Sequence, residues 1–445
     1  MQRLNKIIAW IGLTALTVPA LAQERHAFSL QQALDYAQKN SAQVKNALLD
    51  IQIQEQTNRG ITAGALPSLT GNGSFTDFLK IPTTLVPAQF FGGTAGSFEA
   101  VQFGTKYNAS GGVNLTQTIF DGQVFVGLQA RSTSIAALQK AAEITGENIR
   151  ANIYKVYYQL VVSKTQLDLL DANLARLDKL QHDTKEIYKN GFAEKLDVDK
   201  LDVQMANLQT EKQTTVNSVV IGYQGLKLLM GMPIKDSLVL TDSLSDSQVR
   251  EGALDLGSFK YSDRRDFQLT QLEIKLNEYN VKRYKLSYIP VLSFNASYVQ
   301  NAYRSDFDFF KSGGGWYPTS FIGLSLNVPI FDGFTKDANI KKAKLQVRQY
   351  QNQLDALKIS IDNDIETARL NFNMAISTMD FQRKNMALAE DVYEQTKKKY
   401  EVGTGSNTEI TTAETDLKQA QTNYINAVYS AVIAKVDYLK ATGKL

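Results

Sequence analysis

The sequence predicts an exported membrane protein that combines long α-helices with a transmembrane β-barrel and repeats the same plan twice along the chain. Three features lead to this prediction: an N-terminal export signal, landmarks that recur about 212 residues apart, and alternation between two hydrophobic periods. Composition alone does not decide the class, because 43% apolar and 21% charged residues are ordinary proportions.

Composition does exclude several kinds of function. The formal net charge of +3 over 445 residues gives no reason to expect a nucleic-acid partner. The chain has no cysteine, which excludes disulfides, thiolate metal sites, cysteine nucleophiles and a lipid-modified N-terminal cysteine. His26 and His182 are too few and too far apart for a metal site or a catalytic triad. We find no phosphate-binding or hydrolase motif, so we expect no enzyme activity and no cofactor.

The first 22 residues read as a signal peptide. Arg3 and Lys6 form a basic segment, residues 7–18 are apolar, and small residues precede a cleavage site after Ala22. A membrane anchor is the alternative, but the apolar run is shorter than the ~20 residues that a spanning helix needs. We therefore expect a mature protein outside the cytoplasm without a transmembrane helix.

Two halves of the mature chain align at four landmarks. The matched pairs are Pro67 with Pro290, Gly122 with Gly333, Tyr188 with Tyr400, and Gly231 with Gly443. Their separations are 223, 211, 212 and 212 residues, so only the region between the first two landmarks differs in length. We divide the chain into a first repeat over 23–231, an equatorial connection over 232–262 and a second repeat over 263–445.

Each repeat opens with a helix and continues with two strands. A capping box at Ser29 and Gln32 starts the first helix, which we expect to run towards Arg59, and its counterpart spans about 263–286. A proline then stops each helix, because the residue before proline avoids the α region. Apolar and small polar residues next alternate with period two, which predicts four strands. The alternating stretches are 68–75, 108–119, 292–298 and 322–330.

Alternation of this kind fits either a soluble sandwich or a membrane barrel with a polar lumen. Export and the lack of a helical span favour the barrel. Four strands cannot close in a bilayer, because open edges would leave backbone groups without hydrogen-bond partners. Several chains must therefore share one barrel: two copies would give eight strands, and three would give twelve strands and an open lumen.

Long heptad-patterned helices follow the second strand of each repeat. After Gly122 and Gly333 apolar residues recur in alternating steps of four and three, which is typical of a coiled coil. A helix over 123–188 would be roughly 100 Å long at its usual rise per residue.

Each long helix is interrupted once in the same way. "YKNGFAEKLDVDKLD" begins at Tyr188 and "YEVGTGSNTEITTAE" at Tyr400. We expect the chain to reverse direction at both places, with Gly191, Gly403 and Gly405 supplying the backbone freedom that a tight reversal needs. The two hairpin tips would then lie at the end away from the membrane.

The ordered strings "LQQALDYAQKN", "YIPVLSFNASY", "VPIFDG", "LLMGMPIKDSLVLTDSL" and the last 46 residues resemble the TolC family of outer-membrane efflux ducts. The resemblance covers nearly all of the mature chain. It implies a homotrimer in the outer-membrane lipid of a Gram-negative bacterium, with a twelve-stranded barrel and an α-helical barrel that extends into the periplasm. It also implies docking to a periplasmic adaptor and an inner-membrane RND or ABC-type transporter.

The resemblance implies roles for the hairpin tips, which contain Tyr188, Gly191, Asp197, Tyr400, Gly403 and Glu409. Acids near the second hairpin narrow the periplasmic entrance in the family, and Glu409 occupies that position here, with Asp197 as its equivalent. Tyr400 matches the family's tip tyrosine. Some members have an arginine where this chain has Gly405, so their gating bonds do not carry over. The alternative for both acids is a solvated residue that stabilises a helix start.

Two other functions compete with that of an efflux or secretion duct. An ungated diffusion porin would not explain roughly 100 Å of coiled coil. A structural or adhesive coiled-coil protein of the envelope would not explain strands with one apolar and one polar face.

Overall fold

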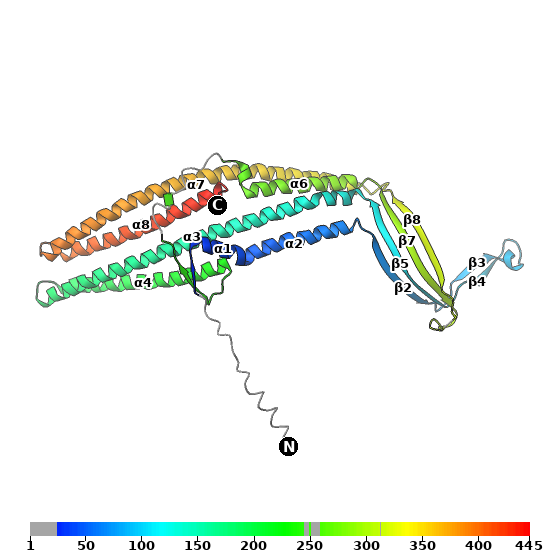
Figure 1. The fold of residues 1–445 in the computed structure, drawn as a ribbon, viewed down its shortest axis with the longest axis horizontal. Coiled ribbons are helices and arrows are strands. Elements are labelled where there is room, and N and C mark those ends of the chain that lie inside the picture. The colour runs from blue at the N-terminus through cyan, green and yellow to red at the C-terminus, as the bar shows by residue number, and fades with distance from the viewer. Residues whose placement is uncertain (1–24, 244–248, 251–258, 312) are drawn as a thin grey trace, which may run out of the picture. The chain divides into compact units, whose positions relative to one another are not determined.

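The computed structural model in Figure 1 describes residues 25–243, 249–250, 259–311 and 313–445. The predicted signal peptide over 1–22 lies outside the described residues. The chain divides into two compact units, which we call the hairpin unit and the strand unit. The hairpin unit comprises Met1–Leu49, Lys140–Gln268 and Asp355–Leu445, and the strand unit comprises Asp50–Gln139 and Leu269–Leu354. Each unit draws on both sequence repeats, and the division at 231 and 262 stays a prediction.

The strand unit contains a four-stranded antiparallel sheet in the order β2-β5-β7-β8 (Figure 1). Its strands are β2 (Ser68–Asp77), β5 (Tyr107–Phe120), β7 (Val291–Arg304) and β8 (Tyr317–Asn327). The four predicted strands are thus confirmed, and strands from the two repeats meet where β5 pairs with β7.

The first strand connection has structure that the sequence pattern did not predict. Residues 80–105 contain a second antiparallel pair formed by β3 (Thr83–Pro87) and β4 (Phe98–Gln102). Both strands have only five residues, which is too short for period two to stand out from a loop rich in glycine and aromatic residues.

The hairpin unit contains the greater part of two antiparallel helical hairpins. The first joins α3 (Gly122–Lys189) to α4 (Lys195–Met230), and the second joins α7 (Thr335–Glu401) to α8 (Asn407–Ala441). Apolar side chains pack between the helices of each pair, as the heptad pattern predicted. Representative buried residues are Leu170, Leu177, Leu201 and Leu208 in the first hairpin, and Tyr393, Ile410 and Leu417 in the second.

The N-terminal helix is interrupted, contrary to the expectation of one helix running to Arg59. The capping box at Ser29 is confirmed, but α1 (Leu30–Asn40) stops at Ser41 and α2 (Ala42–Ala63) begins anew. Ser41 has φ −57° and ψ 128°, outside the helical region. The turn that ends α4 packs at this break, where a Cβ on Gly231 would lie 2.4 Å from the carbonyl oxygen of Asn40.

Two short strands complete the hairpin unit. β1 (Arg25–Phe28) pairs in parallel with β6 (Ser237–Leu240). In the second repeat, α6 (Arg265–Leu286) follows a 3₁₀ turn over Tyr261–Asp263. None of the helices over the described stretches is long and apolar enough to cross a membrane.

Candidate functional site

One face of the four-stranded sheet is apolar and open to its surroundings. The strand register places Leu69 opposite Leu115 and Phe294 opposite Leu324, so apolar side chains meet across neighbouring strands. Leu324 is 68% exposed, and Leu326 and Ile322 are 64% and 78% exposed. An apolar surface of this kind needs a covering, such as lipid or another protein.

The opposite face carries polar side chains that bind each other across the strands. The amide nitrogen of Asn114 donates to Asn72 Oδ1 at 2.8 Å, and the Ser297 hydroxyl donates to Asn114 Oδ1 at 2.7 Å. These contacts form a polar ladder over β2, β5, β7 and β8. Further cross-strand bonds join Ser74 to Ser110 at 2.8 Å and Asn295 to Ser325 at 3.0 Å.

Both hairpin tips reverse the chain through a left-handed glycine. The φ angles of Gly191 and Gly403 are 82° and 77°, as the predicted reversals require. The Gly191 N–H donates to the Tyr188 carbonyl at 2.9 Å, and the Gly403 N–H donates to the Tyr400 carbonyl at 3.0 Å. Gly405 does not have a positive φ; its N–H donates to the Lys399 carbonyl at 3.0 Å.

Asp197 and Glu409 both lie in the first turn of the helix that follows a tip. The Asp197 carboxylate accepts the backbone N–H of Glu194 at 3.4 Å, and the Glu409 carboxylate accepts that of Ser406 at 3.4 Å. Each acid is therefore the N3 residue of a capping box, which satisfies N–H groups at the helix start. Glu409 is also exposed, and its role at an entrance stays a prediction.

The two hairpins of one chain contact each other through polar side chains, and we call this contact the hairpin seam. Thr184 is fully buried, and its hydroxyl lies 3.0 Å from the hydroxyl of Tyr400. Asn173, which is 2% exposed, donates to Gln421 Oε1 at 3.3 Å. Tyr400 thus joins the second hairpin to the first, whereas Tyr188 is 43% exposed.

A buried ion pair in the hairpin seam was missed from the sequence. Arg176 Nε donates to Glu414 Oε1 at 3.2 Å, and its guanidinium lies 5.6 Å from the ring centre of Tyr393. Burial raises the pKa of Glu414, and Arg176 offsets part of this rise. Burial and then the charge of Glu414 raise the pKa of Tyr393 to about 12. The available signal was a charged residue four positions after Ile410, on the apolar stripe of α8.

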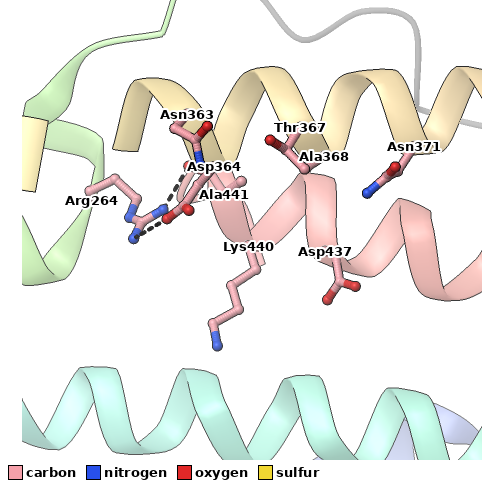
Figure 2. A pocket seen from close by; sticks show the side chains of 9 residues that line it. All are labelled: Arg264, Asn363, Asp364, Thr367, Ala368, Asn371, Asp437, Lys440 and Ala441. Carbon is pink, nitrogen blue, oxygen red and sulfur yellow. Dashed lines mark hydrogen bonds and ion pairs between the residues drawn. The ribbon is translucent and has the colours of Figure 1, made fainter. Parts of the chain in front are cut away.

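An open pocket of about 400 Å³ lies between α7, the end of α8 and the residues before α6 (Figure 2). Its charged side chains are engaged with other groups. Arg264 donates to the Ala441 carbonyl at 3.0 Å and lies 3.9 Å from Asp364. Asp437 pairs with Lys155 at 2.7 Å, and Lys440 donates to Asn148 at 2.8 Å. The contacts made by the residues that line the pocket therefore join these segments to one another.

Comparison with known proteins is consistent with this geometry. Residues 261–444 match the family model of outer membrane efflux proteins. Outer membrane protein TolC of Vibrio cholerae is 20% identical over 337 residues, which cover 76% of this chain and 77% of TolC. The chain is similar to TolC over most of its length. The resemblance predicted from the sequence is thereby confirmed.

Two further comparisons extend this similarity. The outer membrane efflux protein BepC of Brucella suis is 22% identical over 445 residues, which cover 97% of this chain and 88% of BepC. The crystal structure of the Campylobacter jejuni CmeC outer membrane channel superposes with a TM-score of 0.74 at 17% identity, over 96% of this chain and 90% of CmeC. The chain therefore has the fold of this channel, mostly helical with some strands. Their names describe outer-membrane, efflux and channel proteins rather than enzymes.

Proposed function

We propose that this protein is the outer-membrane exit duct of a tripartite efflux or type I secretion system. It would passively conduct substrates from an inner-membrane RND or ABC-type transporter and a periplasmic adaptor to the outside of a Gram-negative cell. Three copies would form the duct, and each would contribute four strands to one barrel and two hairpins to one helical barrel.

The observation that carries this proposal is the opposed chemistry of the two sheet faces. Leu324 and Leu326 on one face are largely exposed, and Asn72, Asn114 and Ser297 form the polar ladder on the other. A transmembrane barrel has this arrangement, with apolar residues towards lipid and polar residues towards the lumen.

The need for several copies follows from the edges of the same sheet. Among the described strands, β2 and β8 are the outer members of the β2-β5-β7-β8 order. An open edge in hydrocarbon costs several kcal/mol for each backbone group without a partner, so β8 of one copy would pair with β2 of the next. Three copies give twelve strands, which encloses an open lumen, whereas eight strands leave an interior that side chains fill.

The helical hairpins favour a duct over the other two candidates. A diffusion porin has no need for helices of 68 and 67 residues such as α3 and α7. A structural coiled-coil protein has no need for a sheet with exposed leucines on one face and a polar ladder on the other.

Two measurements test the proposal. The mature protein extracted in detergent should have the mass of three chains, and a stable monomer would contradict the shared barrel. In a strain that lacks its own exit duct, the protein should restore resistance to exported toxic compounds only when the cognate adaptor and pump are present. Entry of small solutes without adaptor and pump would instead support the porin.

A further inference from the structure

The junctions between strands and helices in the second repeat are strongly basic. There α6 leads into β7, and β8 leads into α7 (Figure 1). The segments that flank these two strands, 279–289 and 330–348, contain eight basic residues and two acidic residues. Their counterparts in the first repeat, 56–66 and 119–137, contain two basic residues and one acidic residue. Both repeats form a helix, two strands and a long helix, so the fold itself does not require the additional charge of the second repeat.

Five exposed lysines account for most of this charge, and we call them the basic collar. They are Lys282 and Lys285 near the end of α6 and Lys341, Lys342 and Lys344 near the start of α7. Lys341 pairs with Asp337 at 2.8 Å, and Lys282 donates to Gln129 at 2.7 Å. Among the described residues, no ion pair involves Lys285, Lys342 or Lys344. The collar therefore has positive charge that the chain itself does not neutralise.

The two parts of the collar lie around one junction. Lys336, in the first turn of α7, has its Nζ 5.7 Å from the ring centre of Tyr288, which follows the end of α6. The same Nζ lies 3.4 Å from the carboxylate of Asp332, in the segment between β8 and α7. These contacts bring the end of α6 next to the start of α7, so the lysines of both helices are close to the strands.

Exposed apolar side chains lie between the collar and the strand β8. Ile330, Phe331 and Phe334 are 93%, 76% and 72% exposed. The rings of Phe331 and Phe334 meet edge to face, with their centres 5.6 Å apart. Phe334 has φ 63°, a left-handed conformation that is uncommon for a residue other than glycine. Aromatic residues followed by lysines are typical of the interface where hydrocarbon gives way to lipid headgroups.

The spacing along the helices matches the depth of a headgroup layer. α7 begins at Thr335, so Lys342 lies about 10 Å along the helix from its start. The headgroup layer on each side of a bilayer is ~5–8 Å thick, and the long stem of a lysine can extend its ammonium group back towards that layer. Arg348 lies about 20 Å from the start of α7, and Lys275 lies about 15 Å before Lys285. The collar thus reaches the headgroup layer, whereas these two exposed cations lie beyond it.

We propose that the basic collar binds the phosphate groups of anionic phospholipids in the leaflet of the outer membrane that faces the periplasm. Ammonium groups donate charge-assisted hydrogen bonds to phosphate oxygens, and several lysines beside a hydrocarbon surface form a site for an acidic headgroup. The exposed leucines of β8 continue from the same junction, which favours a lipid over a free anion as the partner. This inference rests on the proposed function as an outer-membrane duct and adds a lipid partner to it.

Native mass spectrometry of the purified protein in a neutral detergent tests the proposal. The protein is titrated with dioleoylphosphatidylglycerol, with dioleoylphosphatidylcholine, which has the same acyl chains and no net charge, and with inorganic phosphate. Phosphatidylglycerol should bind with an affinity that falls as salt is added, and the other two probes should bind at least about tenfold more weakly. The variant K285Q/K342Q removes two charges of the collar. Each lysine should contribute about fivefold in affinity, so the Kd for phosphatidylglycerol should rise about 25-fold.

The variant K275Q/R348Q is the matched control, because it removes two exposed charges from the same two helices outside the headgroup layer. It should bind phosphatidylglycerol as the wild type does. Equal affinity for phosphatidylglycerol in K285Q/K342Q and the wild type, or equal binding of all three probes, would overturn the proposal, and a native mass of three chains in the same spectra would leave the duct standing. Loss of the three-chain mass in K285Q/K342Q with unchanged lipid binding would assign the lysines to contacts between copies and would also overturn it. A monomeric wild type would overturn the duct and the lipid site together.

Discussion

The guanidinium of Arg176 on α3 and the carboxylate of Glu414 on α8 lie 3.2 Å apart, although the two residues are 238 positions apart in the sequence. Only 9% of the Glu414 side chain is exposed, so its charge has little contact with water. Removing either partner of a buried pair leaves the other charge without compensation. This pair therefore ties the two hairpins of one chain together and makes the seam sensitive to mutation and to pH.

Arg176→Met should destabilise the folded protein by about 3–5 kcal/mol, because Glu414 would remain buried without a counter-charge. The midpoint of denaturant unfolding measures the change. Arg369→Met is the matched control, since Arg369 pairs with Glu366 on the surface of α7, with exposed fractions of 48% and 55%. The control should change stability by less than about 1 kcal/mol. Equal losses of stability in the two variants would show that burial does not make the Arg176–Glu414 pair more important than a surface pair.

Glu414 should also make stability depend on pH. Its pKa is raised in the folded state, so the folded protein holds the proton more tightly than the unfolded chain does. The contribution of Glu414 is then greatest below its ordinary pKa of 4.5 and declines as the pH rises through the raised value. The free energy of unfolding of the wild type minus that of Glu414→Gln should fall as the pH rises above the ordinary value of 4.5. A difference that grows with pH would mean that attraction to Arg176 outweighs burial.

The left-handed tip glycines should resist substitution for backbone reasons alone. A Cβ at Gly191 or Gly403 would meet no atom within 4 Å, so Gly191→Ala and Gly403→Ala test only the positive φ. Each should cost about 1–2 kcal/mol. Gly225→Ala is the control, because Gly225 lies within α4 and also has open space around it. Alanine there should stabilise by about 1 kcal/mol, and a loss at Gly225 similar to that at the tips would contradict the argument.

The two faces of β8 should differ in their tolerance of charge. Leu324→Arg should impair insertion into the outer membrane, at about 2–4 kcal/mol if the residue faces the middle of the bilayer. Ser325→Arg is the control on the neighbouring residue of the same strand, and it should be milder because Ser325 points to the opposite face. The yield of folded protein in outer-membrane fractions measures both. Equal yields would count against the assignment of the leucine face to lipid.

Glu409 should influence ion selectivity if three copies surround one entrance. Glu409→Gln keeps an acceptor for the Ser406 N–H but removes the charge. Recordings from single channels in planar bilayers should then show weaker cation selectivity and less block by trivalent cations from the tip side. Asp197→Asn removes a charge in the same way at the other capping box. This control distinguishes an effect of Glu409 at the entrance from an effect of general surface charge. Unchanged selectivity in Glu409→Gln would leave the residue with its capping role only.

Features coded by local sequence were predicted well. The capping box of Ser29 and Gln32 depends on residues three positions apart, and the alternating strands depend on period two. Both signals lie within a few residues, so they are readable without knowing the rest of the fold.

Features that depend on distant segments were not predicted. The pairing of β1 with β6 joins Arg25 to Ser237, and no local pattern specifies it. The break at Ser41 coincides with the close approach of Gly231, and the sequence around it has no proline or glycine. Arg176 and Glu414 are 238 positions apart, so no local pattern indicates that they pair with each other.

The polar ladder affects how easily a transported molecule would move along this face of the sheet. The side-chain nitrogen of Asn114 is occupied by Asn72, and its oxygen is occupied by Ser297. Groups that already hold each other have less hydrogen-bonding capacity left for a passing molecule, yet they remain polar enough to stay wet. If this face lines the duct, its surface would be hydrated and would bind transported molecules only weakly. Molecules of different chemistry would then move along it with similar ease.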